Sequence, residues 1–259
     1  MKTVILAGGK GTRLSESADS IPKPMVTVGN LPILFHILNI YSSYGFNDFV
    51  LALGYKSEYI KQYFLNFLYI NNDFSLDLNT NKIQVLTNKK YKWKIEFVDT
   101  GLETQTGGRL LKIKDHLNDG EQFMLTYGDG LADININNLL KFHNDNKKMV
   151  TVSAVRPSAR FGELDLNSQG IVTSFKEKPQ INDGWINGGF FVMNKSFINY
   201  IQSAHTVLEK EPLEKLVREN NLAAYRHEGY WQCMDTVRDK DYLNKLWDEG
   251  KAFWVSNND

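Results

Sequence analysis

Cysteine is almost absent from this 259-residue chain, in which Cys233 is the only one. A single cysteine excludes an internal disulfide and is typical of a reducing compartment. Long apolar runs are also missing, because the run that begins at Val4 ends at Ala7, where glycines follow. Such a run is too short for a signal-peptide core, and no later stretch approaches a membrane span. We therefore expect a cytoplasmic protein that does not contact membranes.

An excess of charge of either sign is lacking as well. The 30 basic residues balance the 30 acidic residues, so the formal net charge is zero. No global field therefore draws the protein toward nucleic acid or an anionic membrane, and an anionic substrate must be held by local basic groups. The five histidines have no H-x-x-x-H spacing and no cysteine partner, which disfavours a zinc site.

Short β-rich runs alternate with helical patterns through the first half of the chain. This alternation is typical of parallel βαβ units, so the sequence predicts an α/β fold: a Rossmann-like, mixed but mainly parallel sheet flanked by helices. Strands are expected at 3–7, 49–53, 95–98, 123–127, 150–155, 171–175 and 186–192. Helices are expected at 59–68, 110–117, 137–143, 212–219 and 238–247, with a further one capped by Asn30 and ending at Gly45.

No linker or repeat divides the sequence, so we expect one domain over 1–259. Residues 1–155 would form a nucleotide-binding half, and 156–259 would complete the substrate pocket. The polar, asparagine-rich segment 70–91 looks like an insertion, a loop with a short hairpin. This segment could be a mobile surface loop or a contact between subunits, and the sequence favours neither.

The strongest local signal is the glycine-rich run Leu6–Arg13, directly after the first predicted strand. Three glycines in four positions allow positive φ and let backbone N–H groups surround phosphate oxygens, to which the Arg13 guanidinium adds fixed donors. The run is not a P-loop, because Arg13 stands at the second glycine position. It is not a dinucleotide-binding fingerprint either, because Leu14 occupies the position of the third glycine in that motif. We expect a phosphate-binding turn, although such turns are also common as plain connections.

Two further motifs carry charged side chains on defined backbone. Pro22 and Pro24 fix the backbone around Lys23, which suits a lysine that meets a phosphate, whereas a solvated loop lysine is the plainer interpretation. Asp129 follows an apolar strand and lies between two glycines, where it could hold Mg²⁺ or simply form a turn.

Taken together, the motifs resemble the signature of the sugar-phosphate nucleotidyltransferases, also called pyrophosphorylases. The match is nearly full-length and best to the cytidylyltransferase branch, whose members use CTP and glucose 1-phosphate. Lys10 and Cys233 depart from the family pattern, where an apolar residue and a proline are expected. The matching segments, in order, are Leu6–Arg13, Pro22–Pro24, Thr106–Arg109, Tyr127–Gly130, Phe175–Pro179, Ile186–Phe191 and Trp231–Thr236.

The resemblance implies transfer of a cytidylyl group from CTP to α-D-glucose 1-phosphate by Mg²⁺-assisted in-line attack, giving CDP-glucose and pyrophosphate. It implies catalytic roles for Arg13, Lys23, Asp129 and Lys178. It implies metal binding by Asp129 and Asp235, and sugar-phosphate binding by Glu177, Lys178, Asn187 and Gly188. Nucleotide binding falls to Leu6, Ala7, Gly8, Gly9, Lys10, Gly11, Thr12, Arg13, Lys23, Thr104, Thr106, Gly108, Arg109 and Gly128.

The resemblance also implies a homo-oligomer, a hexamer, and a place in the synthesis of surface polysaccharides such as the lipopolysaccharide O-antigen. Two other functions are open at this stage. One is a related transferase that uses UTP, dTTP or another hexose 1-phosphate. The other is a non-catalytic sensor of sugar nucleotides, although a sensor would not need the full set of charged residues.

Overall fold

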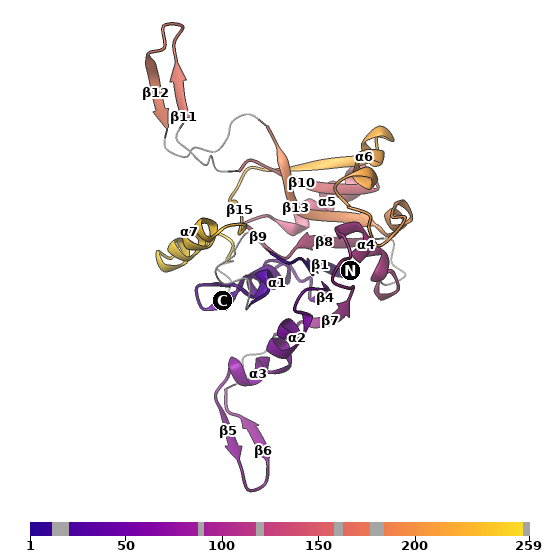
Figure 1. Cartoon of the computed structure of the whole chain (residues 1–259), viewed down its shortest axis with the longest axis vertical. Coiled ribbons are helices and arrows are strands. Elements are labelled where there is room, and N and C mark those ends of the chain that lie inside the picture. The colour runs from indigo at the N-terminus through magenta and orange to yellow at the C-terminus, as the bar shows by residue number, and fades with distance from the viewer. Residues whose placement is uncertain (12–20, 88–90, 118–121, 158–162, 177–183, 256–259) are drawn as a thin grey trace.

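A central mixed sheet organises the molecule (Figure 1). The computed structural model describes residues 1–11, 21–87, 91–117, 122–157, 163–176 and 184–255. In spatial order, the strands of the sheet are β14 (Leu222–His227), β10 (Val150–Val155), β13 (Ile186–Asn194), β8 (Gln122–Tyr127), β1 (Thr3–Ala7), β4 (Asp48–Leu53) and β7 (Lys94–Asp99).

The strands run mainly in one direction. β1 pairs in parallel with β4 and β8, β4 pairs in parallel with β7, and β10 pairs in parallel with β14. β13 lies antiparallel between β8 and β10. The predicted fold class is therefore confirmed. Because β13 and β14 follow residue 155 and pair into the same sheet, both halves of the chain contribute to one layer.

Alternate side chains of β1 enter two different hydrophobic cores. Ile5 and Ala7 pack on one face of the sheet, whereas Val4 and Leu6 pack on the other. A strand buried on both faces carries apolar residues at every position, which is why this run was recognisable. The helices are α1 (Ile33–Ser42), α2 (Ser57–Leu65), α3 (Phe67–Ile70), α4 (Thr106–Lys112), α5 (Ile136–Asn146), α6 (Glu211–Arg218) and α7 (Val237–Asp248), with 3₁₀ turns η2 (Lys23–Met25), η3 (Lys114–His116) and η4 (Lys195–Tyr200).

Several helices differ from the sequence expectation, and the helix expected at 59–68 is divided into α2 and α3. The first helix begins at Ile33 with Pro32 as its N-cap, because Asn30 lies in the turn of a small ladder formed by β2 (Thr27–Val28) and β3 (Leu31–Pro32). The helix expected at 110–117 begins at Thr106 and ends at Lys112, before η3. Its early start was hidden because the first turn contains two glycines, which are poor helix formers.

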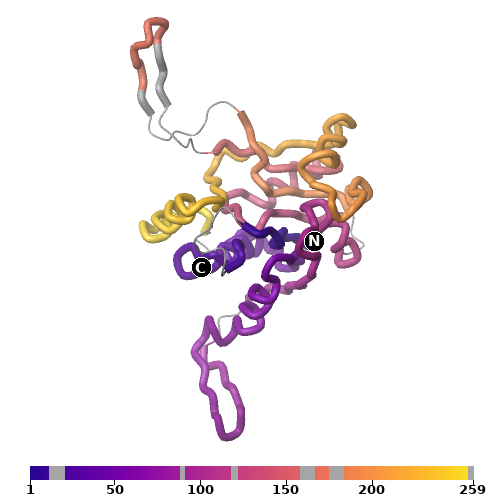
Figure 2. Tube along the Cα trace, viewed as in Figure 1, coloured from indigo at the N-terminus to yellow at the C-terminus, as the bar shows by residue number. Residues whose placement is uncertain are grey.

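Two hairpins project from the body of the molecule in opposite directions, as Figures 1 and 2 show. One consists of β5 (Phe74–Asp77) and β6 (Lys82–Val85) and confirms the hairpin expected within 70–91. The other consists of β11 (Glu163–Leu166) and β12 (Val172–Lys176). A last small ladder pairs β9 (Gly130–Ala132) with β15 (Trp231–Cys233). Among the residues that the structure describes, no helix is long and apolar enough to cross a membrane.

Candidate active site

A pocket opens at the carboxyl ends of β1 and β8, the edge where ligands bind in open α/β sheets. The Leu6–Gly11 run, the Lys23 segment, the start of α4 and the end of β8 meet there. Its lining residues are Leu6, Ala7, Gly8, Gly9, Gly11, Lys23, Pro24, Thr104, Gln105, Thr106, Arg109, Tyr127, Gly128 and Asp129. Most of the residues expected to bind the nucleotide therefore lie around one cavity.

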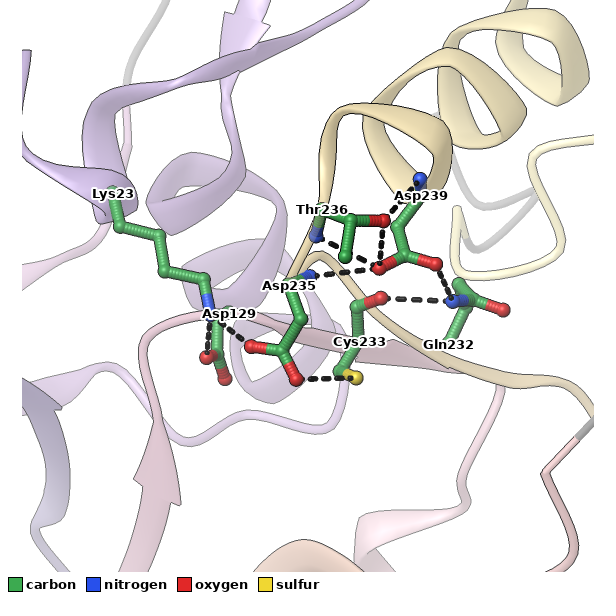
Figure 3. A network of polar contacts seen from close by, with 7 residues as sticks. All are labelled: Lys23, Asp129, Gln232, Cys233, Asp235, Thr236 and Asp239. Atoms are coloured by element: carbon green, nitrogen blue, oxygen red, sulfur yellow. Dashed lines mark hydrogen bonds and ion pairs between the residues drawn. The ribbon is translucent and has the colours of Figure 1, made fainter. Parts of the chain in front are cut away.

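Lys23 is the central charged group of this region (Figure 3). Its ammonium nitrogen lies 2.5 Å from Oδ2 of Asp129 and 2.6 Å from Oδ1 of Asp235. The neighbouring backbone is closely packed, because a Cβ on Gly128 would lie 3.2 Å from the Pro24 ring and one on Gly11 would lie 2.8 Å from Cβ of Lys23. The side chain therefore enters the pocket from a fixed segment, as the flanking prolines predicted.

The two carboxylates come together through backbone pairing. Asp129 directly precedes β9 and Asp235 lies just beyond β15, and these strands pair with Cys233 opposite Gly130. The Met234 amide also donates to the carbonyl oxygen of Asp129 at 2.9 Å. Residues far apart in the sequence are thus held side by side by a short ladder.

The start of α7 fixes the backbone at Asp235. Thr236 caps the helix in a capping box, in which its hydroxyl accepts from the Asp239 amide while the Asp239 carboxylate accepts from the Thr236 amide. The same carboxylate accepts from the amide of Asp235 at 3.1 Å. These bonds satisfy backbone donors that a helix start leaves free. Figure 3 shows how this network continues the Lys23 cluster.

Burial by itself would lower the pKa of Lys23, but the charge of Asp129 and the hydrogen bonds to both carboxylates outweigh it, so the pKa is raised. The lysine is thus held as an ammonium ion, which neutralises two acidic groups that would otherwise repel each other.

The Asp129 and Asp235 pair also fits the divalent cation that the family resemblance implies. The Lys23 ammonium acts as a stand-in ion, because it shows that one oxygen of each carboxylate can reach the same cation. Among the described residues, no group of three or more His, Cys, Asp or Glu side chains forms a metal cage. Two carboxylates with the other positions left to phosphates and water match the way Mg²⁺ is usually bound.

Cys233 lies next to Asp235, but its surroundings do not favour the reactive thiolate. Its thiol donates to Oδ2 of Asp235 across 3.5 Å. Burial and the negative charges of Asp235 and Asp129 raise the pKa of the thiol to about 12. The group stays a protonated thiol, which fits a packing role and not a reactive one.

Arg109 lies beneath the glycine-rich turn. Its guanidinium donates to the carbonyl oxygens of Gly8 at 2.9 Å and Leu53 at 3.0 Å, and to the hydroxyl of Thr100. A Cβ on Gly8 would lie 2.2 Å from the guanidinium, and one on Gly54 would lie 2.6 Å from it. The arginine thus ties the turn to β4, and the loop glycines leave room for it. Five hydrogen bonds hold the guanidinium to protein oxygens.

The glycines before Arg109 have a packing role. A Cβ on Gly108 would lie 2.1 Å from the carbonyl oxygen of Ala204, and one on Gly107 would lie 2.8 Å from that of Thr206. The amide of Gly108 donates to the Thr206 carbonyl at 3.1 Å. These glycines therefore let the 204–208 segment lie directly against the start of α4.

Sequence reasoning missed two residues, Tyr127 in the pocket lining and Glu209 in contact with it. The Tyr127 hydroxyl donates to Oε1 of Glu209 at 2.6 Å and accepts from Nδ2 of Asn187 at 3.3 Å. Tyr127 had a signal, because it begins the Tyr127–Gly130 motif. Glu209 had none, since it is an exposed glutamate in a polar stretch.

The remaining expected site residues are spread more widely. Lys10 is exposed and pairs with Glu103 at 2.8 Å, and Thr104 donates to the carbonyl oxygen of Thr100 at 2.6 Å. The carbonyl oxygen of Gly188 accepts from the Trp231 indole at 2.7 Å. Thr12, Arg13, Glu177 and Lys178 lie outside the described residues.

Comparison with known proteins gives close matches over nearly the whole chain. The sequence model described as nucleotidyl transferase matches residues 2–246. A glucose-1-phosphate cytidylyltransferase from Salmonella typhimurium is 46% identical over 254 residues, which cover 98% of each protein. A mannose-1-phosphate guanylyltransferase catalytic subunit beta from Dictyostelium discoideum is 30% identical, over 95% of this chain and 64% of that protein. The crystal structure of HddC from Yersinia pseudotuberculosis shares the fold with a TM-score of 0.69 and 23% identity, over 95% of this chain and 99% of that one.

Proposed function

The chain belongs to the nucleotidyl transferase family, and from this premise we propose that it joins CTP and α-D-glucose 1-phosphate to give CDP-glucose and pyrophosphate. The 46% identity to a glucose-1-phosphate cytidylyltransferase, over 98% of both chains, supports this choice of substrates. The observation that carries the proposal is the convergence of Asp129 and Asp235 on Lys23, at the edge of a pocket bordered by the glycine-rich turn.

The reaction needs placement and charge neutralisation more than covalent chemistry. An oxygen of the sugar phosphate attacks the α-phosphorus of CTP in line, and pyrophosphate leaves on the opposite side. The nucleophile is already anionic at neutral pH, so no enzyme-bound intermediate is required. The main electrostatic cost is the repulsion between two polyanions, which fixed cationic groups and backbone donors reduce.

Asp129 and Asp235 are the residues that would hold Mg²⁺. The ion would supply positive charge to the triphosphate. With Mg²⁺ held by these carboxylates, the Lys23 ammonium would be available to bind a phosphate oxygen. Arg13 and Lys178 are proposed, from the sequence resemblance, to contact the nucleotide phosphates and the sugar 1-phosphate.

The test is a panel of CTP, UTP, dTTP and GTP with glucose 1-phosphate, followed by pyrophosphate release with and without Mg²⁺. We expect CTP with Mg²⁺ to give the fastest release. A faster reaction with another triphosphate would overturn the choice of base and leave the reaction class intact. No release with any triphosphate would overturn the enzyme assignment and favour the sensor.

We also propose that the protein is a cytoplasmic homo-oligomer, a hexamer, that supplies CDP-glucose for surface polysaccharides such as the lipopolysaccharide O-antigen. The exposed apolar side chains on the β5–β6 hairpin, Phe74, Leu76, Ile83 and Val85, support a subunit contact there. Sedimentation of the purified protein tests the assembly, and a monomer at micromolar concentration would contradict it.

A further inference from the structure

Glu209 connects two hydroxyl groups that line the pocket. Its Oε1 accepts from the Tyr127 hydroxyl at 2.6 Å, and its Oε2 accepts from the Thr106 hydroxyl at 2.7 Å. Tyr127 ends β8 and Thr106 begins α4, so the carboxylate bridges two elements of the pocket wall. Each carboxylate oxygen is thus assigned to one hydroxyl proton.

The segment that precedes Glu209 is anchored closely enough to set its position. The Leu208 amide donates to Oγ1 of Thr106 at 2.9 Å, and the Gln105 amide donates to the carbonyl oxygen of Ala204 at 2.9 Å. The absence of side chains at Gly107 and Gly108 permits this close approach. The segment that carries Glu209 is therefore held against the start of α4, and this fixes the position from which Glu209 contacts Tyr127.

The bond to Glu209 determines the polarity of the Tyr127 hydroxyl. A carboxylate has no proton to donate, so the phenol must be the donor in this pair. With its only proton directed at Glu209, the phenol oxygen can act toward the pocket only as an acceptor. Its bond from Nδ2 of Asn187, at 3.3 Å, uses one lone pair of that oxygen and leaves the other for a ligand.

Tyr127 also lies where the two reactants would meet. In the sheet, β8 lies between β1, which leads into the glycine-rich turn, and β13, which carries Asn187. Two residues beyond Tyr127 is Asp129, which binds Lys23.

We propose that Glu209 is a positioning residue for sugar recognition: it holds the hydroxyl proton of Tyr127, which leaves the phenol oxygen as the acceptor for a hydroxyl group of the hexose 1-phosphate. The inference rests on the proposed function, because it assigns the sugar-facing wall of the same pocket. Loss of Glu209 lets the Tyr127 hydroxyl rotate, so its oxygen is no longer held as an acceptor and its hydrogen bond from the sugar is weakened.

The experiment compares Glu209→Ala, Tyr127→Phe and the double variant, with Glu211→Ala as the matched control. Glu211 is an exposed glutamate two residues further along the chain, at the start of α6. We expect either single variant to raise the KM for glucose 1-phosphate about tenfold, the scale of one hydrogen bond, while the KM for CTP changes less than about twofold. The double variant should show no further increase, because both changes remove the same interaction.

Calorimetric binding of CDP-glucose and of CDP isolates the sugar moiety. Glu209→Ala should weaken CDP-glucose about tenfold and leave CDP unchanged, with Glu211→Ala like wild type. Equal weakening of both ligands, additive effects in the double variant, or a lower melting temperature with unchanged constants would each overturn the proposal. If the wild-type protein does not bind CDP-glucose, the proposed function is wrong and the role of Glu209 is still open to test. The same comparison is then made with the sugar nucleotide that the protein produces in the triphosphate panel.

Discussion

The backbone amide of Met234 donates to the carbonyl oxygen of Asp129 at 2.9 Å, and this bond joins two distant parts of the chain at the pocket. It extends the β9–β15 ladder by one step, so Asp235, the next residue, must lie beside Asp129. A pair of carboxylates built this way depends on a few backbone bonds and on the helix cap that follows Asp235.

Asp129→Ala and Asp235→Ala should each reduce kcat/KM at least about a thousandfold, roughly 4 kcal/mol, because each removes a proposed ligand for the divalent cation. Pyrophosphate release from CTP and glucose 1-phosphate measures the loss. The matched control is Asp133→Ala, since Asp133 is a nearby carboxylate that pairs with His227 at 2.9 Å. It should retain turnover within about threefold. Near wild-type turnover in either site variant would contradict the assignment.

Lys23→Met should lower the stability of the metal-free protein by about 1–2 kcal/mol, because Asp129 and Asp235 then lose the ammonium group that lies between them. The value is reduced from that of a fully buried pair, since Asp129 is 27% and Asp235 is 36% exposed. Mg²⁺ should raise the melting temperature of this variant more than that of wild type. A smaller rise than in wild type would show that Lys23 does not compete for the position between the carboxylates. Lys23→Arg, which keeps the charge, is the control.

Acid should destabilise the protein through His36. Its Nε2 donates to the carbonyl oxygen of Val28 at 3.0 Å, and its Nδ1 accepts from the Trp254 indole at 3.2 Å. Burial lowers the pKa of His36, because a second ring proton would be costly there. Below pH 6.5, the ordinary pKa of histidine, the unfolded chain binds a proton at His36 that the folded chain does not bind. The free energy of unfolding therefore decreases as the pH is lowered.

Urea unfolding at pH 7.5 and pH 5.0 measures this dependence. The contribution of one histidine is at most about 1.4 kcal/mol per pH unit. His36→Gln should unfold at lower urea at pH 7.5 but lose less on acidification than wild type does. His143 also has a lowered pKa, caused mainly by burial, and remains in this variant, so part of the slope should persist. An unchanged slope would exclude His36 as the group responsible.

Cys233 should react slowly with a thiol reagent at pH 8. The pKa of its thiol is raised to about 12 by burial and by the charges of Asp235 and Asp129, so the reactive thiolate is scarce in the folded protein. The rate in native buffer should be at least about a hundredfold below that in denaturant, where an ordinary pKa returns. Because the chain has no other cysteine, one absorbance trace suffices. Comparable rates in both conditions would contradict this account.

Most of the central sheet was predictable because its strands are short, apolar and separated by helical patterns. β1, β4 and β8 lie where their apolar runs indicated, and Asp129 follows β8 as expected. The β9–β15 ladder was not expected, since strands of three residues leave almost no periodic signal. The role of Arg109 under the glycine-rich turn was equally hidden, because a motif does not reveal which way a long side chain points.

The sequence alone determined the family, the α/β architecture and the identity of the charged residues, because apolar runs and ordered motifs are local properties of the chain. Only the tertiary structure decided that Lys23 binds both acidic partners and that Glu209 holds the proton of Tyr127. Those contacts join residues about a hundred or more positions apart in the first case and 82 apart in the second. Such pairs follow from how strands and loops pack, which residue spacing does not encode.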